Sequence, residues 1–228
     1  MNTLSKTDRI INRILEVDNF QNVACFCADF AEFVQELAEW GVDGCAKVDF
    51  TKLPKPSRNK GDRGQLLELA LGIPNSSNLT DMVDGELKTY TRGESIAVTQ
   101  LKHVLPEIFD KIPFSQTKVG KKLQQTLYVG FDRDNNFLDS ITLSREVDLR
   151  HYQELEEDFN YITEVIRYRY NTGKELSTIT GKNGLLQIRT KDSKDKKGNY
   201  HPIKWKGYTL KDKGMAFYLT GKFGKELM

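Results

Sequence analysis

The feature that most constrains the fold of this chain is a long amphipathic helix, which the sequence predicts over residues 148–171. Its apolar side chains recur at helical spacing, at Leu149, Tyr152, Leu155, Phe159, Ile162 and Ile166. Such a stripe marks a helix that buries one face against the rest of the protein. Glutamates Glu154, Glu156 and Glu157 fall on the opposite side.

Strand-forming segments lie on both sides of this helix. Leu127, Tyr128 and Val129 have the apolar character of a central strand, and a second strand over 137–143 follows a polar turn. Further strands are predicted over 185–191, 205–209 and 215–220. Shorter helices are predicted over 5–17, 24–40, 63–72 and 99–110, and residues 51–62 are predicted to form a loop. A change in character near residues 172–180 predicts a boundary between two lobes.

Composition excludes several classes of protein. The 228 residues are 38% hydrophobic and 29% charged, which is typical of a soluble globular protein. No apolar run is long enough to cross a bilayer, and the N-terminus has no signal-peptide pattern. We therefore expect a cytoplasmic protein. Cys25, Cys27 and Cys45 are interpreted as reduced packing residues rather than a zinc site, because the histidines lie far from them in the sequence.

The distribution of charge says more than the net charge of +2. Between Lys174 and Lys225 basic residues outnumber acidic ones, whereas the segment Glu154–Asp158 is acidic. A basic stripe beside metal-binding carboxylates would suit a phosphate backbone.

The stretch that carries the chemistry is Asp81-Met82-Val83-Asp84-Gly85-Glu86-Leu87-Lys88. If residues 86–88 form a strand, Glu86 and Lys88 project from the same face. An upstream aspartate can then join Glu86 around one Mg²⁺ ion, with Lys88 beside a reacting phosphate. Two other acid-x-lysine triplets, at 192–194 and 195–197, lie in a polar run that is typical of a loop. The triplet at 86–88 differs because a turn precedes it and strand-forming residues follow it.

Two further residues have two interpretations each. Glu68 is a single acid among leucines, so it lies either on the solvent side of a helix or in a buried charged site. Lys60 lies in the proline-containing loop, which is either a plain surface connection or a loop that faces DNA.

Several stretches together resemble, in order, the MutH family of DNA endonucleases. They are Asn59-Lys60-Gly61-x-x-Gly64-Gln65-Leu66-Leu67-Glu68-x-x-Leu71-Gly72, Gly85-Glu86-Leu87-Lys88-Thr89, Lys122-Leu123-x-x-x-Leu127-Tyr128-Val129, Ile179-Thr180, Gly184-x-Leu186-Gln187-Ile188-Arg189-x-Lys191 and Phe217-Tyr218-Leu219. The resemblance spans residues 57–224. An ordered set of motifs is more specific than any one of them.

The resemblance implies an α/β fold with a restriction-endonuclease-like core, in which a mixed central sheet is flanked by helices and two lobes surround a DNA cleft. It implies Mg²⁺ as cofactor, double-stranded DNA as substrate and GATC or a related short site as target. The family includes type II restriction enzymes, for which a homodimer on DNA is one arrangement. It also includes the strand-nicking enzyme of methyl-directed mismatch repair, which works with a MutL-type partner.

The resemblance also implies roles for individual residues. Asp81, Glu86 and the carbonyl of Leu87 correspond to metal ligands, and Lys88, Lys122 and Glu68 to other members of the catalytic centre. Arg189, Lys191 and Tyr218 correspond to positions that contact DNA, and Thr190 lies between the first two in the recognition loop. Lys60 is a further candidate DNA contact because of its loop. Arg189 either reads a guanine with two hydrogen bonds or clamps a phosphate.

Two departures from the family leave alternatives open. Asp81 is closer to Glu86 than in the repair enzyme, so Asp84 stays an alternative first metal ligand, although it lies in the turn. Thr190 stands where the repair enzyme has proline, which affects the exact target sequence. The basic insertion at 192–206 favours a restriction enzyme over a repair nickase. The set of catalytic residues argues against a third alternative, an inactive DNA-binding protein.

These assignments divide the chain into three parts. Residues 1–56 are predicted to form a helical region packed on the core. Residues 57–172 form the predicted catalytic lobe, and residues 173–228 form the predicted DNA-recognition lobe.

Overall fold

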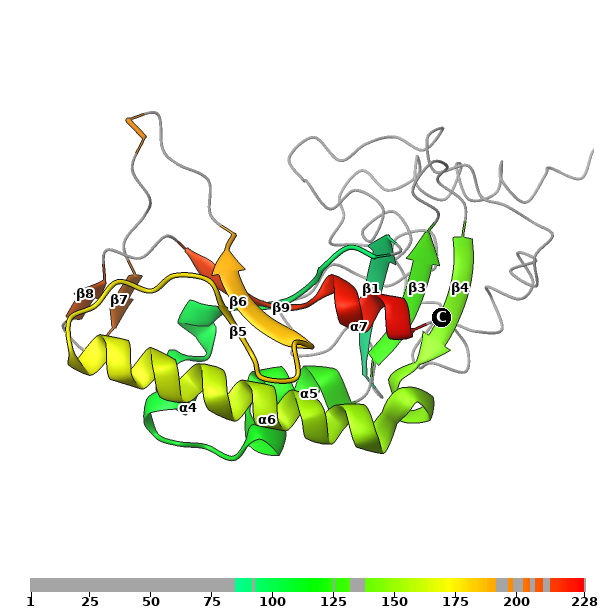
Figure 1. Ribbon diagram of the computed structural model, residues 1–228, viewed down its shortest axis with the longest axis horizontal. Helices are drawn as coiled ribbons and strands as arrows, with labels where there is room; N and C mark the ends of the chain where they lie inside the picture. Colours follow the sequence, from blue (N-terminus) through cyan, green and yellow to red (C-terminus); the bar gives the residue numbers. More distant parts are fainter. Residues whose placement is uncertain are drawn as a thin grey trace, which may run out of the picture. The chain divides into compact units, whose positions relative to one another are not determined.

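The structure is a computed structural model, shown in Figure 1. It describes residues 85–91, 93–124, 126–131, 138–191, 197–198, 203–205, 208–210 and 214–227. These residues belong to two compact units. Unit 1 contains the strands β1, β3 and β4, and unit 2 contains residues 93–124 and the described residues from 144 onwards. The chain is therefore a mixed α/β protein, as predicted.

Unit 1 is built on a three-stranded mixed sheet in the order β1-β3-β4. Strand β1 (Glu86–Thr91) runs parallel to β3 (Thr126–Phe131), and β4 (Leu138–Leu143) runs antiparallel to β3. β3 is the central strand, which confirms the prediction from its continuous apolar run. Leu87, Leu127 and Val129 are buried in its core.

The parallel pairing of β1 and β3 requires a crossover, since a tight hairpin cannot join parallel strands. Here the connection between the two strands passes through unit 2. It contains β2 (Ile96–Gln100), the 3-10 turns η2 (Leu101–His103) and η3 (Phe114–Gln116), and the helices α4 (Leu105–Phe109) and α5 (Lys118–Gln124).

Unit 2 is built on a four-stranded antiparallel sheet in the order β2-β9-β6-β5. The added strands are β5 (Ile179–Thr180), β6 (Leu186–Thr190) and β9 (Met215–Leu219), and the helix α7 (Gly221–Glu226) follows β9. Every residue of β9 is buried, as expected for a strand with a partner on each side. A separate hairpin consists of β7 (Ile203–Trp205) and β8 (Tyr208–Leu210).

The long helix α6 (Ser144–Asn171) packs on one face of this sheet, along β5 and β6 (Figure 1). Its Phe159 ring lies 5.6 Å from the ring of Phe217 on β9 and 5.1 Å from that of Phe114. Ile162 and Ile166, from the predicted apolar stripe, are fully buried. The helix predicted over 148–171 is confirmed, and it begins four residues earlier, directly after β4.

A buried carboxylate on α6 holds the turn that leads into β6. Asp158 is 0% exposed, and its Oδ1 accepts a hydrogen bond from the backbone N–H of Asn183 at 2.6 Å. Its Oδ2 accepts from the N–H groups of Leu185 and Leu186, at 2.8 and 2.9 Å. A charged acceptor with three N–H donors makes strong hydrogen bonds in a buried site. Asp158 therefore fixes where β6 starts.

Two predicted elements have different boundaries in the structure. The helix predicted over 99–110 was wrong in its first part: residues 99–100 pair with β9, residues 101–103 form η2, and only α4 is α-helical. Pro106 stands at the start of α4, where its missing N–H does no harm. The strand predicted over 205–209 was also wrong, because these residues span the end of β7 and the start of β8.

The boundary predicted at residues 172–173 falls within unit 2, between α6 and β5, which pack on each other. The predicted helical region 1–56 lies outside the described residues. In the part of the chain that is described, no helix has the length and apolar character to cross a membrane.

Candidate functional site

The chemistry predicted for residues 86–88 lies on β1 in unit 1. The ammonium group of Lys88 forms an ion pair with Oε1 of Glu86 and donates a hydrogen bond to the carbonyl oxygen of Leu87 at 3.0 Å. The Glu86 side chain is only 3% exposed, and that of Lys88 is 23% exposed. The two residues lie on one face of the strand, as the alternation of side chains predicts.

The sheet explains why Glu86 is buried. Parallel pairing places Glu86 beside Thr126 and Lys88 beside Tyr128, both of which are buried on the central strand. Tyr128 in turn packs edge-on against Tyr90, with 6.5 Å between ring centroids. An ionised carboxylate in such a place is unstable unless a cation accompanies it. Lys88, two residues farther along the strand, provides that positive charge.

Two oxygen atoms on this strand converge on one cationic group. Glu86 Oε1 and the Leu87 carbonyl oxygen both contact the ammonium of Lys88. Carboxylate and carbonyl oxygens are the ligands that hard divalent cations prefer. Glu86 and Leu87 therefore supply two oxygen atoms of the kind that could hold Mg²⁺.

The remaining members of the predicted centre are placed as follows. Asp81, its alternative Asp84, and Glu68 lie outside the described residues, so their roles stay predictions. Among the residues that the structure describes, no three acidic, histidine or cysteine side chains form a metal-binding group. Lys122 lies half-buried on α5 in unit 2, whereas Glu86 and Lys88 belong to unit 1.

The predicted recognition residues Arg189 and Tyr218 are brought together in unit 2. The guanidinium carbon of Arg189 lies 4.2 Å from the centre of the Tyr218 ring. Antiparallel pairing of β6 with β9 sets Gln187 opposite Tyr218 and Arg189 opposite Ala216, so these side chains share one face of the sheet. The other face carries Ile188 and Phe217, which α6 covers.

The other predicted contact residues lie at the end of β6 or outside the described residues. Thr190 is the last residue of β6 and, by alternation, belongs to the face of Ile188 rather than that of Arg189. Lys191 is exposed, and its N–H donates to the carbonyl of Gly214 at 2.8 Å. Lys60 lies outside the described residues.

Gln187 and Ser95 share the face of Arg189, and no role follows for them from the resemblance. Gln187 Nε2 donates to Ser95 Oγ at 3.4 Å, between β6 and the residue that precedes β2. Both side chains are partly exposed. The signal for Gln187 is its position two residues before Arg189 in a predicted strand, which puts both on one face. Nothing in the sequence near residue 95 indicates this contact.

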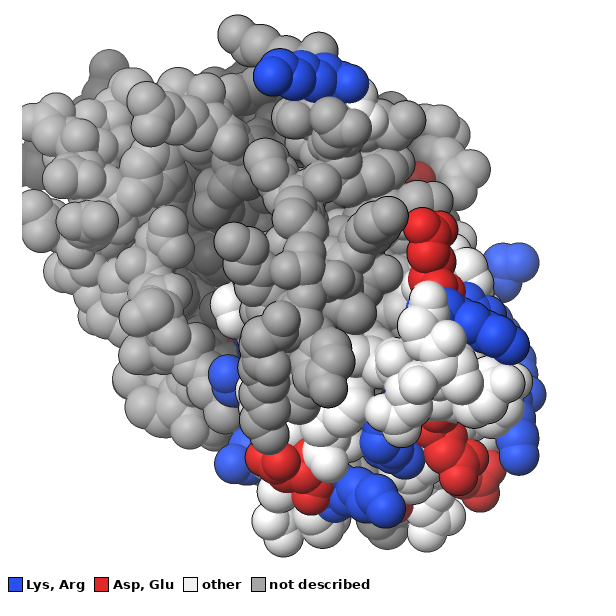
Figure 2. All heavy atoms as spheres, turned by 90° about the vertical axis from the view of Figure 1, so that its left-hand side faces the viewer, with Lys and Arg blue, Asp and Glu red and all other residues white. Residues whose placement is uncertain are grey.

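The described part of the face in Figure 2 carries charges of both signs, with lysine and arginine side chains beside aspartate and glutamate. Two ionisable groups of unit 2 have shifted pKa values. Burial and then the nearby charges of Lys102 and Lys118 lower the pKa of His103. Burial and then Glu156 raise the pKa of Tyr152.

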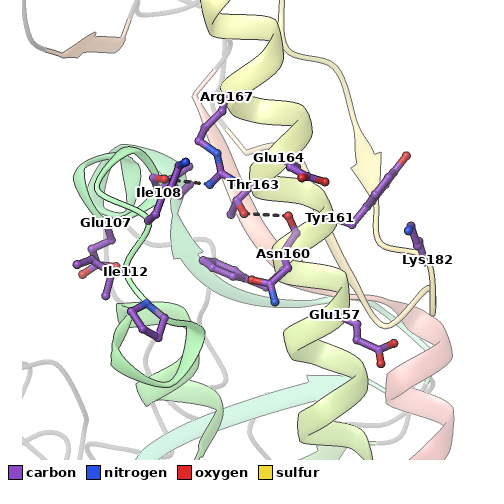
Figure 3. Close-up of a pocket in the computed structure, with 13 residues that line it drawn as sticks. Glu107, Ile108, Ile112, Glu157, Asn160, Tyr161, Thr163, Glu164, Arg167 and Lys182 are labelled. Carbon is purple, nitrogen blue, oxygen red and sulfur yellow. Dashed lines mark hydrogen bonds between the residues drawn. The ribbon is translucent and has the colours of Figure 1, made fainter.

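A groove of about 490 Å³ lies between α6 and the turn that follows α4 (Figure 3). Ile108 and Phe159 contribute buried apolar surface to its lining. Arg167 donates from Nη1 to the carbonyl of Ile108 at 3.0 Å and so ties α6 to α4. Acidic and basic side chains both line the groove, so its charge selects no class of ligand.

Comparisons with known proteins add no relative: no family model matches this chain, and no curated protein matches it.

Proposed function

We propose that this protein is a Mg²⁺-dependent, sequence-specific DNA endonuclease of the type II restriction class, with GATC or a related short site as its target. The observation that carries the proposal is the convergence of Glu86 Oε1 and the Leu87 carbonyl oxygen on the ammonium group of Lys88. This arrangement suits hydrolysis of a phosphodiester, which needs positioning and charge stabilisation more than covalent help.

The residues divide the work in this proposal. Asp81, Glu86 and the Leu87 carbonyl would hold Mg²⁺, which when bound lowers the pKa of a water and offsets charge on the phosphate. Lys88 orients the attacking water, and Lys122 stabilises the charge that develops on the phosphate oxygens. Water forms the new bond to phosphorus in line with the leaving 3′ oxygen. The products carry a 5′-phosphate and a 3′-hydroxyl, because the 3′ oxygen takes a proton from solvent as it leaves.

The face of Arg189 and Tyr218 supports the sequence-specific part of the proposal. Arginine donates two parallel hydrogen bonds to the edge of guanine, which is the commonest base-specific contact. An arginine held over an aromatic ring loses less freedom when it binds. The basic insertion at residues 192–206 supports cleavage without a partner protein, and thus restriction rather than repair.

Digestion of duplex DNA tests the proposal. Purified protein alone, with Mg²⁺, is incubated with unmethylated and with adenine-methylated DNA, and the ends are sequenced. We expect cuts in both strands at one short site and no cleavage without Mg²⁺. Nicking of one strand that needs a MutL-type partner would instead support the mismatch-repair alternative. Intact DNA under all conditions would overturn the proposal.

A further inference from the structure

We infer that Gln187 is a specificity-determining residue, which reads an adenine beside the base that Arg189 reads, and that Ser95 orients its amide. This inference deepens the proposed function and rests on it. It starts from the sheet of unit 2, where Gln187 and Arg189 project from one face of β6 while Ile188 between them is buried against the opposite side.

Neighbouring residues hold the face of β6 that carries Gln187 and Arg189. Arg189 is exposed, but its guanidinium lies over the ring of Tyr218, which is itself only 8% exposed. Gln187 stands directly opposite Tyr218 in the register of β6 and β9. The start of β6 is fixed by three hydrogen bonds to Asp158. Side chains on so well-anchored a strand keep their spacing, as base recognition requires.

The amide of Gln187 can bind Ser95 and a ligand at the same time. A primary amide has two N–H donors and one acceptor oxygen. The contact with Ser95 Oγ uses one N–H, and it leaves the amide with a second N–H and Oε1 for a ligand. Adenine presents the matching pair in the major groove, since its N7 accepts and its N6 amino group donates. Ser95 therefore sets the amide in the orientation that adenine needs.

The spacing of Gln187 and Arg189 along β6 can be compared with the spacing of base pairs in DNA. Two residues along a strand span about 7 Å, and successive bases of duplex DNA are about 3.4 Å apart along the helix axis. A strand lying along the groove would then place Gln187 within about two base pairs of the base that Arg189 contacts. A guanine and an adenine at that separation are the expected pair.

The experiment compares variants on a library of DNA sites with random sequence, scored by sequencing the cleaved ends. The variants are Gln187→Ala, Gln187→Glu, Ser95→Ala and Arg189→Ala, with Gln153→Ala as control, since Gln153 is an exposed glutamine on α6. We expect Gln187→Ala to lose roughly tenfold to a hundredfold of the preference for adenine at one position. Arg189→Ala should lose the preference for guanine at a neighbouring position, and Gln153→Ala should change neither.

Two further variants distinguish base recognition by Gln187 from orientation of its amide by Ser95. Gln187→Glu has an acceptor but no donor at this place, so its preference should move from adenine towards cytosine. Ser95→Ala should weaken the adenine preference less than Gln187→Ala does. Thermal unfolding of each variant shows whether it is folded.

Two results would overturn the inference while the proposed function stands. One is a wild-type protein that cuts one site while Gln187→Ala keeps full discrimination at every base pair. The other is a uniform loss of cleavage in Gln187→Ala with unchanged preferences, which indicates a structural role. A wild-type protein that cuts no DNA in the library would overturn the proposed function itself.

Discussion

Lys88 on β1 and Arg189 on β6 are both cations that a neighbouring side chain holds, but their surroundings differ. Lys88 accompanies a carboxylate that is 3% exposed, in a sheet whose central strand buries Thr126, Leu127, Tyr128 and Val129. Arg189 lies over Tyr218 and is exposed to solvent. A charge in a buried site interacts strongly with its neighbours, whereas water screens an exposed one. The first arrangement suits chemistry, and the second suits recognition of a large polar partner.

Replacing Lys88 should give the largest effect. In Lys88→Ala the buried Glu86 carboxylate loses its ammonium neighbour, and the proposed centre loses the group that orients water. We expect cleavage to fall by at least roughly a thousandfold while binding to the target site changes little. Single-turnover cleavage and a filter-binding assay measure the two quantities. Lys102→Ala, at an exposed lysine of η2, is the control, and equal activity of the two variants would refute the role of Lys88.

Replacing Asp158 should give the next largest effect, and on stability. In Asp158→Ala the N–H groups of Asn183, Leu185 and Leu186 lose their acceptor, and the last two are buried. The expected loss is about 3–5 kcal/mol in the free energy of unfolding. Urea denaturation measures it, with Glu156→Ala, on the same helix, as the control. A loss below about 1 kcal/mol would show that β6 does not depend on this carboxylate.

Removing the ring under Arg189 should have a smaller effect. Tyr218→Leu keeps a large apolar side chain opposite Gln187 but removes the aromatic face. An exposed cation–π contact contributes about 0.5–1 kcal/mol, which corresponds to a twofold to fivefold weaker binding of the target site. Fluorescence anisotropy with a labelled duplex measures the change. Unchanged affinity and preference would mean that the ring does not position Arg189.

The smallest effect concerns His103, near the charges of Lys102 and Lys118. Burial and these two cations lower its pKa below the ordinary value of 6.5. Its neutral form is therefore favoured in the folded state, so its contribution to stability is present above pH 6.5 and is lost as the pH falls below it. NMR titration of the imidazole should give a pKa below 6.5, and Lys118→Gln should raise it. A pKa at or above 6.5 in the wild type would contradict the expectation.

The sequence predicted the regular elements where a single physical pattern dominates. The apolar stripe from Leu149 to Ile166 identified α6, and the apolar run at residues 127–129 identified the central strand of unit 1. It failed at residues 99–110, where residues 99 and 100 pair with β9 and where the α-helix begins only at Leu105. Long-range pairing cannot be read from local composition.

The sequence likewise predicted one part of the candidate site and not another. Alternation along β1 was enough to place Glu86 and Lys88 on one face. The contact of Arg189 with Tyr218 depends on the register of two strands far apart in the sequence, and only the resemblance pointed to both residues. The role of Asp158 was missed because an acid in an acidic helical segment has the sequence signature of a solvated residue. Its burial depends on three N–H groups that belong to a distant turn.

The most direct test of the central claim is a double-mutant cycle on Glu86 and Lys88. Single-turnover cleavage of a duplex with one target site is measured with Mg²⁺ for the wild type, Glu86→Gln, Lys88→Ala and the double variant. Residues that act as one catalytic unit have strongly non-additive effects. We predict that the double variant is about as slow as either single variant, each at least roughly a thousandfold below wild type. Single variants that cleave at the wild-type rate would contradict the assignment of this strand as the nuclease centre.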